Sequence, residues 1–373
     1  MHQLIAAPFQ NKRIILHPRS SKTLTVPPPK YEELTHSVAE HDRLPDWLIR
    51  GANRAWDLVL PAEAAHKTIV VRVAGPYEIT RATWEINLGC DYDCKMCFLG
   101  KKKFAGLDWE GKKRLLRVMR DAGVIWLQIT GGEPLIDPDF QAAYALAYSL
   151  GMQLEILSNG SQLRRPRIHT LLTNLPPSKL TLSVYGASAA TYDGLTRRRG
   201  AYARFRAGLY GVLDAGLNVD LSLIITNDNA HEVDEMRAWA RELGLPYREY
   251  ANISPTYSGG AETLPSQSPQ HLTQRAPFTG CPAGHTFFHA DPHGRASICK
   301  IGREPHVNLM TEGVEGLRAL AGIADQLMLR TGGCSGCQLS GTCRVCRPMA
   351  KIFQEAKAPL HSYCQHGQKE TVS

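Results

Sequence analysis

The sequence predicts an α/β fold built on a parallel sheet, with a small α+β unit before it and a cysteine-rich region after it. Short apolar segments alternate with helical segments from residue 84 to about residue 251, a pattern typical of parallel sheets. Two short strand-like segments followed by two helical segments fill residues 1 to about 75. Seven of the ten cysteines come after residue 280.

Length and composition limit the possible classes of protein. With 373 residues, 43% of them hydrophobic, the chain can form one large domain or two to three smaller ones. No apolar run approaches the ~20 residues of a membrane span, and the first ten residues lack the pattern of a secretory signal. We therefore expect a cytoplasmic protein with no membrane association, in which clustered cysteines bind metals. The sequence indicates no oligomeric state.

The formal net charge of +8 includes basic runs at 101–103 and 197–199. Most of these side chains are expected to be solvated surface. A basic surface also attracts an acidic electron donor such as a flavodoxin, or an acidic peptide. The chain has no zinc-finger helix and no basic stripe with interleaved aromatic residues, so nucleic acid is not an expected partner.

Residues 1–75 are expected to form a separate unit. The segments Arg13–His17 and Lys22–Val26 are typical of two short strands joined by a turn. The segments Tyr31–Glu40 and Pro45–Leu58 have helical spacing. This order is similar to the small winged-helix domains that recognise precursor peptides, and such a domain can add a leader peptide as a strand at its sheet edge. The alternative is a cap that only packs on the rest of the chain.

Six strands with helical segments between them are expected in the central region. They are Trp84–Leu88, Val124–Thr130, Gln153–Leu157, Leu180–Val184, Val219–Ile225 and Tyr247–Tyr250. The helix Trp109–Ala122 places Leu115, Leu116 and Met119 on one side. Six units are too few for a closed eight-stranded barrel, and in such barrels the chemistry lies at the carboxyl ends of the strands.

Three cysteines follow the first of these strands: Cys90, Cys94 and Cys97. Neighbouring loop cysteines rarely meet the geometry of a disulfide, whereas thiolates are the usual ligands of iron–sulfur clusters. Three thiolates on a four-iron cluster leave one iron open to a substrate or cofactor. The alternatives are a zinc loop or three reactive thiols.

The spacing C-x3-C-x2-C resembles the signature of the radical S-adenosylmethionine (SAM) superfamily. The resemblance implies that Cys90, Cys94 and Cys97 bind a 4Fe-4S cluster whose open iron chelates SAM, and that Phe98 lies near the adenine. It implies a partial (β/α)6, TIM-like barrel. It also implies reductive cleavage of SAM to a 5′-deoxyadenosyl radical, which abstracts a hydrogen atom from the substrate.

The second expected strand runs into Thr130-Gly-Gly-Glu-Pro134. Two glycines allow the backbone to approach a ligand closely, and the carboxylate that follows can accept hydrogen bonds from an ammonium group. This turn matches the Gly-Gly-Glu motif of the family. The resemblance therefore implies that Gly131, Gly132 and Glu133 hold the methionine amino group of SAM.

Polar residues end the third and fourth strands. The resemblance implies that Ser158, Asn159 and Ser183 also bind the cofactor, although by chemistry alone they are equally suited to helix caps. Ile225 is a candidate for packing on the adenine, and it is equally plausible as core. Many family members have Arg-Gly where this chain has Thr196-Arg197, so no arginine is assigned to the cofactor.

The seven later cysteines resemble the SPASM extension, which carries auxiliary iron–sulfur clusters. The resemblance implies two auxiliary clusters, the first on Cys281, Cys299 and Cys346 and the second on Cys334, Cys337, Cys343 and Cys364. Two residues separate the last close pair where the common pattern has three, which leaves the assignment of Cys346 open. The first cluster then has an open iron or a ligand other than cysteine. The alternative is a zinc ribbon on Cys334, Cys337, Cys343 and Cys346.

Histidines and a few mouth-side residues complete the candidates. His285, His289 and His293 lie between two of these cysteines, and we expect them to be exposed loop residues rather than ligands. Tyr185, Tyr257 and Lys300 are candidates for a place near the substrate, and no residue is assigned as the catalytic acid or base.

The SPASM extension is associated with enzymes that act on peptides and proteins. We therefore expect three domains, a precursor-recognition or capping domain (1–75), a radical SAM barrel (76–255) and a SPASM domain (256–373). The expected function is that of an oxidoreductase which installs a crosslink or another oxidative modification in a ribosomally synthesised peptide, usually carrying a leader.

Three alternatives remain open. The first is a sulfatase-maturing type of enzyme that oxidises a protein side chain. Lys300 counts against it, because those enzymes have an acidic residue at that position. The second is an enzyme acting on a small molecule. The third is a non-enzymatic electron carrier, which would not need the Gly-Gly-Glu turn.

Overall fold

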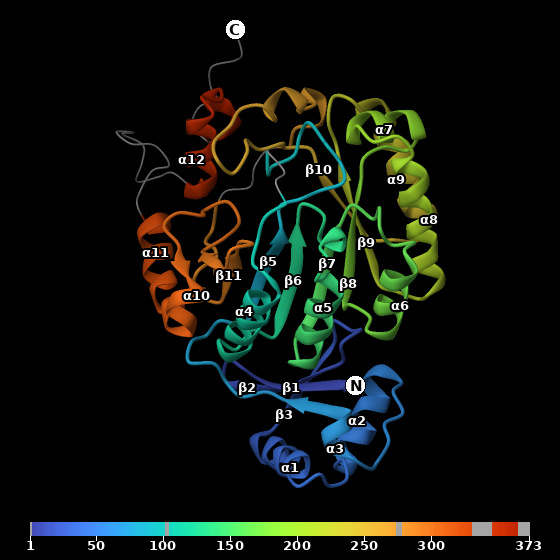
Figure 1. Cartoon of the computed structure of the whole chain (residues 1–373), viewed down its shortest axis with the longest axis vertical. Coiled ribbons are helices and arrows are strands. Elements are labelled where there is room, and N and C mark those ends of the chain that lie inside the picture. Colours follow the sequence, from blue (N-terminus) through green and yellow to red (C-terminus); the bar gives the residue numbers. More distant parts are fainter. Residues whose placement is uncertain (1, 101–103, 274–277, 330–344, 365–373) are drawn as a thin grey trace.

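Two sheets organise the chain in the computed structural model, which describes residues 2–100, 104–273, 278–329 and 345–364. A four-stranded sheet has the order β3-β2-β1-β4, and a nine-stranded sheet has the order β10-β9-β8-β7-β6-β5-β11-β12-β13. Figure 1 shows the smaller sheet below the larger one, and the arrows of β5 and β6 point away from it. The smaller sheet therefore lies at the amino end of the larger sheet.

The N-terminal unit contains more strands than the sequence predicts. Its elements are β1 (Leu4–Phe9), β2 (Lys12–Leu16), β3 (Thr23–Val26), α1 (Pro28–Ala39), α2 (Asp46–Trp56), α3 (Ala65–Thr68) and β4 (Ile69–Val71). The predicted strands correspond to β2 and β3, and the predicted helices to α1 and α2. β1 lacks the expected alternation because both of its faces are buried. Leu4 and Ala6 pack in the core of the unit, whereas Ile5 and Ala7 pack against Ile125 of the central region.

The six predicted parallel strands are confirmed, in the predicted order. They are β5 (Arg81–Asn87), β6 (Trp126–Gly131), β7 (Gln153–Ser158), β8 (Lys179–Val184), β9 (Val219–Ile224) and β10 (Tyr247–Tyr250). The helices between them are α4 (Trp109–Asp121), α5 (Phe140–Ser149), α6 (Pro166–Asn174), α7 (Ala189–Thr196), α8 (Ala201–Asp214) and α9 (Val233–Glu242).

Strands from the cysteine-rich region extend this sheet. β11 (Phe287–Ala290) pairs in parallel with β5, and β12 (Arg295–Ser297) and β13 (Val307–Asn308) add antiparallel strands. Three helices follow: α10 (Leu309–Glu312), α11 (Arg318–Leu329) and α12 (Arg347–Glu355). Short 3-10 helices are η1 (Pro134–Ile136), η2 (Ala230–Glu232), η3 (Leu264–Ser266), η4 (Pro269–His271), η5 (Gly313–Leu317) and η7 (Leu360–Ser362). In the described parts of the chain, no helix is long and apolar enough to cross a membrane.

The two faces of the larger sheet differ in chemistry. On one face, apolar residues such as Leu127 and Leu154 are fully buried in a core shared with the helices, because alternate residues of a strand point to the same face. On the other face, one register row crosses five neighbouring strands and is polar throughout. This polar row consists of His289, Thr83, Gln128, Glu155 and Lys179.

The polar row is linked within itself. The Thr83 hydroxyl lies 2.8 Å from Nδ1 of His289, Gln128 donates to Glu155 at 3.2 Å, and Nζ of Lys179 lies 3.8 Å from the same carboxylate. A packed barrel interior is normally filled by branched apolar residues. This face is therefore suited to a polar ligand.

The N-terminal unit is attached to the larger sheet by two buried side chains. The Arg72 guanidinium donates to the carbonyls of Arg120, Val124 and Gly151 at 2.7, 3.0 and 2.9 Å. Two of these carbonyls lie at the carboxyl ends of α4 and α5, where a cation is favourable. The Gln153 amide accepts from Trp126 and donates to the carbonyls of residues 17 and 20.

Candidate active site

The cysteine loop occupies residues 88–100, directly after β5. Cys90 and Cys94 pack against the main core, and Cys94 also contacts a small cluster that includes Met96. Tyr185 lies at the end of β8 beside this loop. Burial, followed by the nearby Cys94 thiol, raises the pKa of Tyr185 well above its ordinary value, and Cys90 and Cys97 act in the same direction. Cys94 and Tyr185 also pack against the same small apolar cluster, so the cysteine loop lies at the carboxyl end of the sheet.

The Gly-Gly-Glu turn lies against the start of the cysteine loop. The Gly132 amide donates to the Asn87 carbonyl at 3.0 Å, and the Glu133 amide donates to the Gly89 carbonyl at 2.8 Å. A Cβ on Gly131 would overlap the Asn87 carbonyl, and one on Gly132 would overlap the Gly89 carbonyl. The glycines thus allow two backbone segments to approach each other, whereas the sequence suggested an approach to a ligand.

Glu133 joins the ends of two strands. Its side chain is fully buried, and it accepts from the Ser158 hydroxyl at 2.8 Å, the Asn159 amide at 2.7 Å and the Leu135 amide at 3.0 Å. Burial raises its pKa to about 8, although the three hydrogen bonds favour the ionised form. The predicted residues of two motifs therefore meet in one network.

Asn159 connects that network to the cysteine loop. Its amide nitrogen donates to the Asp91 carboxylate at 2.9 Å and to Sγ of Cys90 at 3.7 Å, and its oxygen accepts from the Ser161 amide at 2.8 Å. Gln162 donates to the other oxygen of Asp91 at 2.7 Å. Asp91 and Gln162 were not predicted from the sequence. The position of Asp91 between two candidate ligands was the one available signal.

Asn87 is a third residue of the site that the sequence did not indicate. It is the last residue of β5 and is 1% exposed. Its amide nitrogen lies 3.4 Å from the Glu133 carbonyl, but its buried amide oxygen has no hydrogen-bond donor among the described residues. Buried polar atoms are normally paired, so this oxygen marks a place for a ligand with a donor group.

The other predicted cofactor contacts differ in how deeply they are buried. Ser183 is half-buried on the polar face of β8. Phe98 is half-buried with its ring 6.0 Å from that of Tyr257. Ile225 is fully buried against Val233 and Ala251, which is the packing expected of a core residue.

The prediction that His289 is an exposed loop residue is wrong. It is fully buried in β11, because this segment adds a strand to the sheet, and its Nε2 lies 3.5 Å from Glu85. Arg303 forms two hydrogen bonds with the Glu85 carboxylate, at 2.9 and 2.7 Å, and lies 4.1 Å from the centre of the Tyr257 ring. Burial alone would raise the pKa of Glu85, but His289 and Arg303 lower it to about 2.

The remaining candidates come from the segments that follow the central sheet. His285 pairs with Asp325, and His293 and Lys300 are exposed. Cys281 and Cys299 lie close together, and the Gly302 amide donates to Sγ of Cys299 at 3.1 Å. Cys346 precedes α12 and Cys364 follows η7. Cys334, Cys337 and Cys343 lie outside the described residues.

In the described ranges, no three His, Cys, Asp or Glu side chains are close enough to hold one metal ion. The ligands of an iron–sulfur cluster each bind a different iron. Such ligands therefore lie farther apart than the ligands of a single metal ion.

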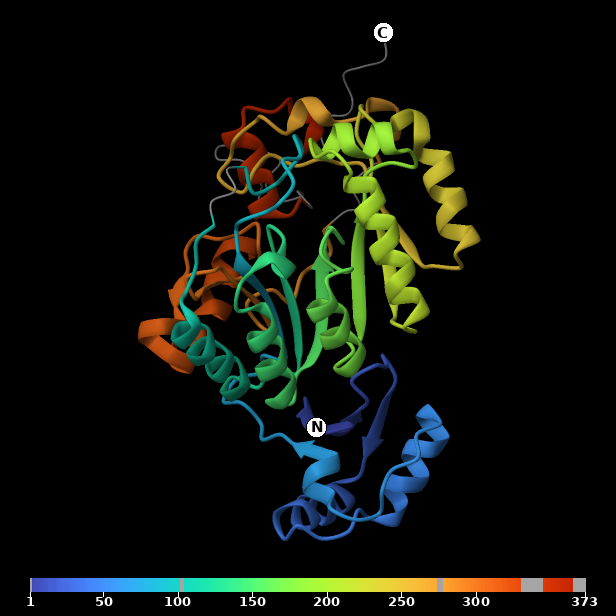
Figure 2. The same ribbon diagram turned by 45° about the vertical axis from the view of Figure 1, so that its right-hand side comes forward.

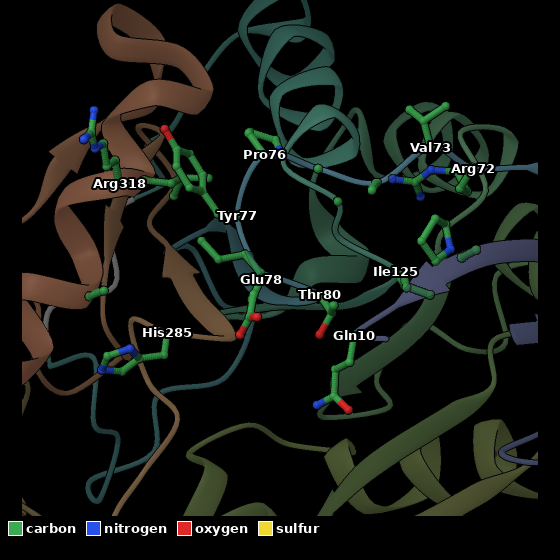
Figure 3. A pocket seen from close by; sticks show the side chains of 18 of the residues that line it. Gln10, Arg72, Val73, Pro76, Tyr77, Glu78, Thr80, Ile125, His285 and Arg318 are labelled. Atoms are coloured by element: carbon green, nitrogen blue, oxygen red, sulfur yellow. The ribbon is translucent and has the colours of Figure 1, made fainter. Parts of the chain in front are cut away.

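A hollow of about 500 Å³ lies at the other end of the sheet. The β1–β2 turn, residues 72–80 and the segment before α11 line it. Figure 3 shows Gln10, Glu78 and Thr80 around this space. It contains no residue of the cysteine loop or of the Gly-Gly-Glu turn, so it is distinct from the candidate site.

Residues 84–240 match the model of the radical SAM superfamily. This part of the chain is a radical SAM domain. Such a domain implies SAM and a 4Fe-4S cluster, and the three-cysteine loop and the Gly-Gly-Glu turn both lie within it.

Curated relatives share about a quarter of the aligned residues. The mycofactocin maturase MftC of Mycobacterium tuberculosis (strain CDC 1551 / Oshkosh) is 26% identical over 62% of this chain and 68% of that protein. The PqqA peptide cyclase of Gluconobacter oxydans is 26% identical over 53% of this chain and 56% of that protein. The subtilosin biosynthesis protein AlbA of Bacillus subtilis is 23% identical over 45% of this chain and 38% of that protein. The chain thus spans between about two fifths and two thirds of these relatives.

Solved structures share the fold. Streptococcus suis SuiB bound to the precursor peptide SuiA has a TM-score of 0.58 with 16% identity and covers 93% of both chains. The structure of anSMEcpe with bound AdoMet and the Kp18Cys peptide has a TM-score of 0.51 with 13% identity, covering 74% of this chain and 95% of that one.

Proposed function

We propose that this chain is a radical SAM oxidoreductase that modifies a ribosomally synthesised peptide, introducing a crosslink or another oxidative change. The observation that carries the proposal is the single network at the carboxyl end of the sheet. It joins the Gly-Gly-Glu turn, Asn159 and Cys90 through hydrogen bonds of 2.7 and 3.7 Å. The relatives named as maturases and as a peptide cyclase, and the fold shared with a precursor-bound enzyme, support a peptide as the substrate.

The residues present fit a cluster and SAM. Cys90, Cys94 and Cys97 lie on one loop, and sulfur-directed N–H groups from Tyr92 and Asn159 suit a thiolate at Cys90. When bound, the cluster and SAM supply a 5′-deoxyadenosyl radical that removes a hydrogen atom from the substrate. The buried oxygen of Asn87 is positioned beside the Gly-Gly-Glu turn to accept from the methionine amino group. Phe98, Gly131, Gly132, Glu133, Ser158, Ser183 and Ile225 remain proposed cofactor contacts.

The polar row offers a surface for the peptide. Its side chains hydrogen-bond to one another, yet Gln128, Glu155 and Lys179 are only half-buried. Amide and carboxylate groups exposed on a sheet face can pair with the backbone of an extended chain. We propose that the barrel orients one C–H bond of the peptide over this face and excludes water from the radical.

The N-terminal unit is the proposed binding place for a leader. β3 is at the edge of its sheet, with the side chains of Thr23 and Thr25 exposed. An edge strand presents unpaired N–H and C=O groups to an incoming strand. The unit lies at the amino end of the larger sheet, so a bound leader and the cysteine loop are separated by at least the length of a six-residue strand, about 20 Å.

The C-terminal cysteines are proposed to hold two auxiliary clusters, which makes three 4Fe-4S clusters in all. Cys281, Cys299 and Cys346 are assigned to the first, and Cys334, Cys337, Cys343 and Cys364 to the second. The proposed domains are 1–75, 76–255 and 256–373. The second boundary separates functions rather than sheets, because β11 to β13 continue the sheet of the barrel.

The substrate for the experiment is a candidate precursor peptide, to be sought among short coding sequences beside this gene. Anaerobic turnover with SAM and a reductant should yield 5′-deoxyadenosine and a peptide that has lost two hydrogen atoms, as seen by mass spectrometry. Hydrogen exchange should show that the peptide protects the amides of β3, while those of the inner strand β1 serve as the internal control. A peptide that is unmodified and leaves β3 unprotected would contradict the peptide proposal.

A further inference from the structure

Two runs of arginine lie beside the cysteine loop on the outer side of the sheet. Arg164, Arg165 and Arg167 lie between β7 and α6 and in the first turn of α6, and Arg197, Arg198 and Arg199 lie between α7 and α8. All six are exposed, and we call them the arginine rim. The first connection leaves the sheet at the carboxyl end of β7, and the second joins the two helices that follow β8.

Both runs are attached to the same short piece of the cysteine loop. Gln162, two residues before Arg164, donates to Asp91 at 2.7 Å. Arg197 lies 3.3 Å from the Asp93 carboxylate, and the Asp93 amide donates to the Thr196 carbonyl at 3.0 Å. Both aspartates are between Cys90 and Cys94. The arginine rim therefore borders the loop that carries the proposed cluster ligands.

The two runs are also held to each other. The helices that follow them pack side by side, because the His169 ring on α6 lies 3.2 Å from the Gly211 carbonyl on α8. Gly208 brings α8 against Leu163, next to Arg164. Figures 1 and 2 both show α6 and α8 as neighbours. The arginine rim is thus one surface rather than two.

The arginine rim has little opposing charge. Among the described residues, Arg197 is the one member that pairs with a carboxylate. Acids close by are occupied elsewhere: Asp193 accepts from the amides of Gly200 and Tyr202, and Glu232 accepts from the start of α7. Arg237 on α9, by contrast, pairs with both Asp234 and Glu249. Unpaired cations of one sign produce a positive potential that attracts acidic partners.

We propose that the arginine rim is the docking surface for an acidic flavoprotein that delivers single electrons to the cluster at Cys90, Cys94 and Cys97. The proposal rests on the proposed function. One electron leaves the reduced flavin, which becomes a semiquinone, and the cluster gains it, passing from the 2+ to the 1+ state. The peptide is assigned to a different surface, since the polar row is on the opposite face of the sheet from α6 and α8.

The test uses the full chain with its clusters reconstituted and no peptide present. The rim variant is Arg164→Glu/Arg198→Glu/Arg199→Glu, which leaves the pair of Arg197 with Asp93 intact. The matched control, Arg43→Glu/Arg50→Glu/Arg117→Glu, makes the same change of charge at exposed arginines of the N-terminal unit and α4. Stopped-flow absorbance follows cluster reduction by flavodoxin hydroquinone at several salt concentrations, and by dithionite in high salt.

At low salt, flavodoxin should reduce the rim variant at least about 10-fold more slowly than the wild type, and the rate should depend less on salt. The control variant should be reduced at a rate within about 2-fold of the wild-type rate. Equal rates in the rim and control variants would overturn the docking proposal. A separate binding titration measures the affinity of each protein for the precursor peptide. A rim variant that loses this affinity but is reduced by flavodoxin as fast as the wild type would overturn the proposal in favour of an acidic peptide. If dithionite reduces the cluster in all three proteins, the proposed function stands whatever the flavodoxin rates are.

Discussion

The two ends of the larger sheet use buried polar groups in different ways. At the amino end, the side chains of Arg72 and Gln153 form hydrogen bonds with backbone carbonyls and with Trp126. At the carboxyl end, the Glu133 carboxylate has a pKa raised to about 8 by burial, and the Asn87 oxygen has no donor within the described residues. Buried side chains that bind backbone carbonyls hold two units together, whereas a buried carboxyl with a shifted pKa and an unpaired amide oxygen beside three cysteines are candidate ligand contacts. The amino end is therefore the joint that attaches the N-terminal unit to the larger sheet, and the carboxyl end is the candidate active site.

The largest expected effect is at the carboxyl end. The variant Cys90→Ala/Cys94→Ala/Cys97→Ala should yield no 5′-deoxyadenosine with SAM and dithionite, because the open-iron cluster has lost its ligands. Iron and sulfide analysis should show that the auxiliary clusters remain, and thermal unfolding should be close to that of the wild type without its first cluster. Residual 5′-deoxyadenosine would show that other residues hold the cluster. The carboxyl end would then not be the active site.

Next in size is the pair between β5 and the segment after Cys299. Replacing Arg303 by Met leaves the buried Glu85 carboxylate without its cation and should lower the free energy of unfolding by about 3–5 kcal/mol near neutral pH. Denaturant unfolding measures it. The double variant Glu85→Gln/Arg303→Met removes the unpaired charge and should recover part of the loss. A double variant no more stable than the single one would contradict this explanation.

The same variant gives a prediction about pH. In the wild type the pKa of Glu85 is lowered to about 2, so its contribution is fully present above about pH 4.5 and is lost as the pH falls through about 2. In Arg303→Met the lowering by Arg303 is lost and that by His289 remains, so the pKa of Glu85 should rise and the stability gained between about pH 2 and 4.5 should be smaller than in the wild type. Unfolding curves across that range check the sign, and a constant difference between the two proteins would refute it.

A smaller effect is expected at the amino end. Arg72→Met removes three hydrogen bonds to buried carbonyls and should cost about 2–3 kcal/mol of unfolding free energy. The exposed Arg117→Met on α4 is the matched control and should change stability by less than about 0.5 kcal/mol. The folded Arg72 variant should still produce 5′-deoxyadenosine without peptide, since the joint holds no cofactor. Loss of that product in a folded protein would show that the two ends are coupled.

The smallest effect sharpens the description of the site. Asn159→Ser removes the amide N–H that points at Sγ of Cys90, while Gln162 still binds Asp91. Because hydrogen bonds to cluster sulfurs raise the reduction potential, the variant should have a lower potential with little change in stability. A redox titration followed by electron paramagnetic resonance measures it, and an unchanged potential would limit Asn159 to a structural role.

How much of this was visible in the sequence depends on how local each signal is. The six parallel strands and the three motifs at their ends were predicted because alternation and short spacings are local. β1 and His289 were not, because the first is buried on both faces by a distant segment and the second is buried by pairing of β11 with β5. The contact of Arg303 with Glu85 joins residues 218 positions apart, and no pattern in the sequence predicts it.

The central claim is that the loop thiols hold a cluster with an open iron that binds SAM. The direct test is to prepare the full chain without oxygen, analyse its iron, sulfide and zinc, and add SAM with dithionite. We expect the protein to contain iron with sulfide and to release 5′-deoxyadenosine. Zinc without sulfide, and no cleavage of SAM, would contradict it.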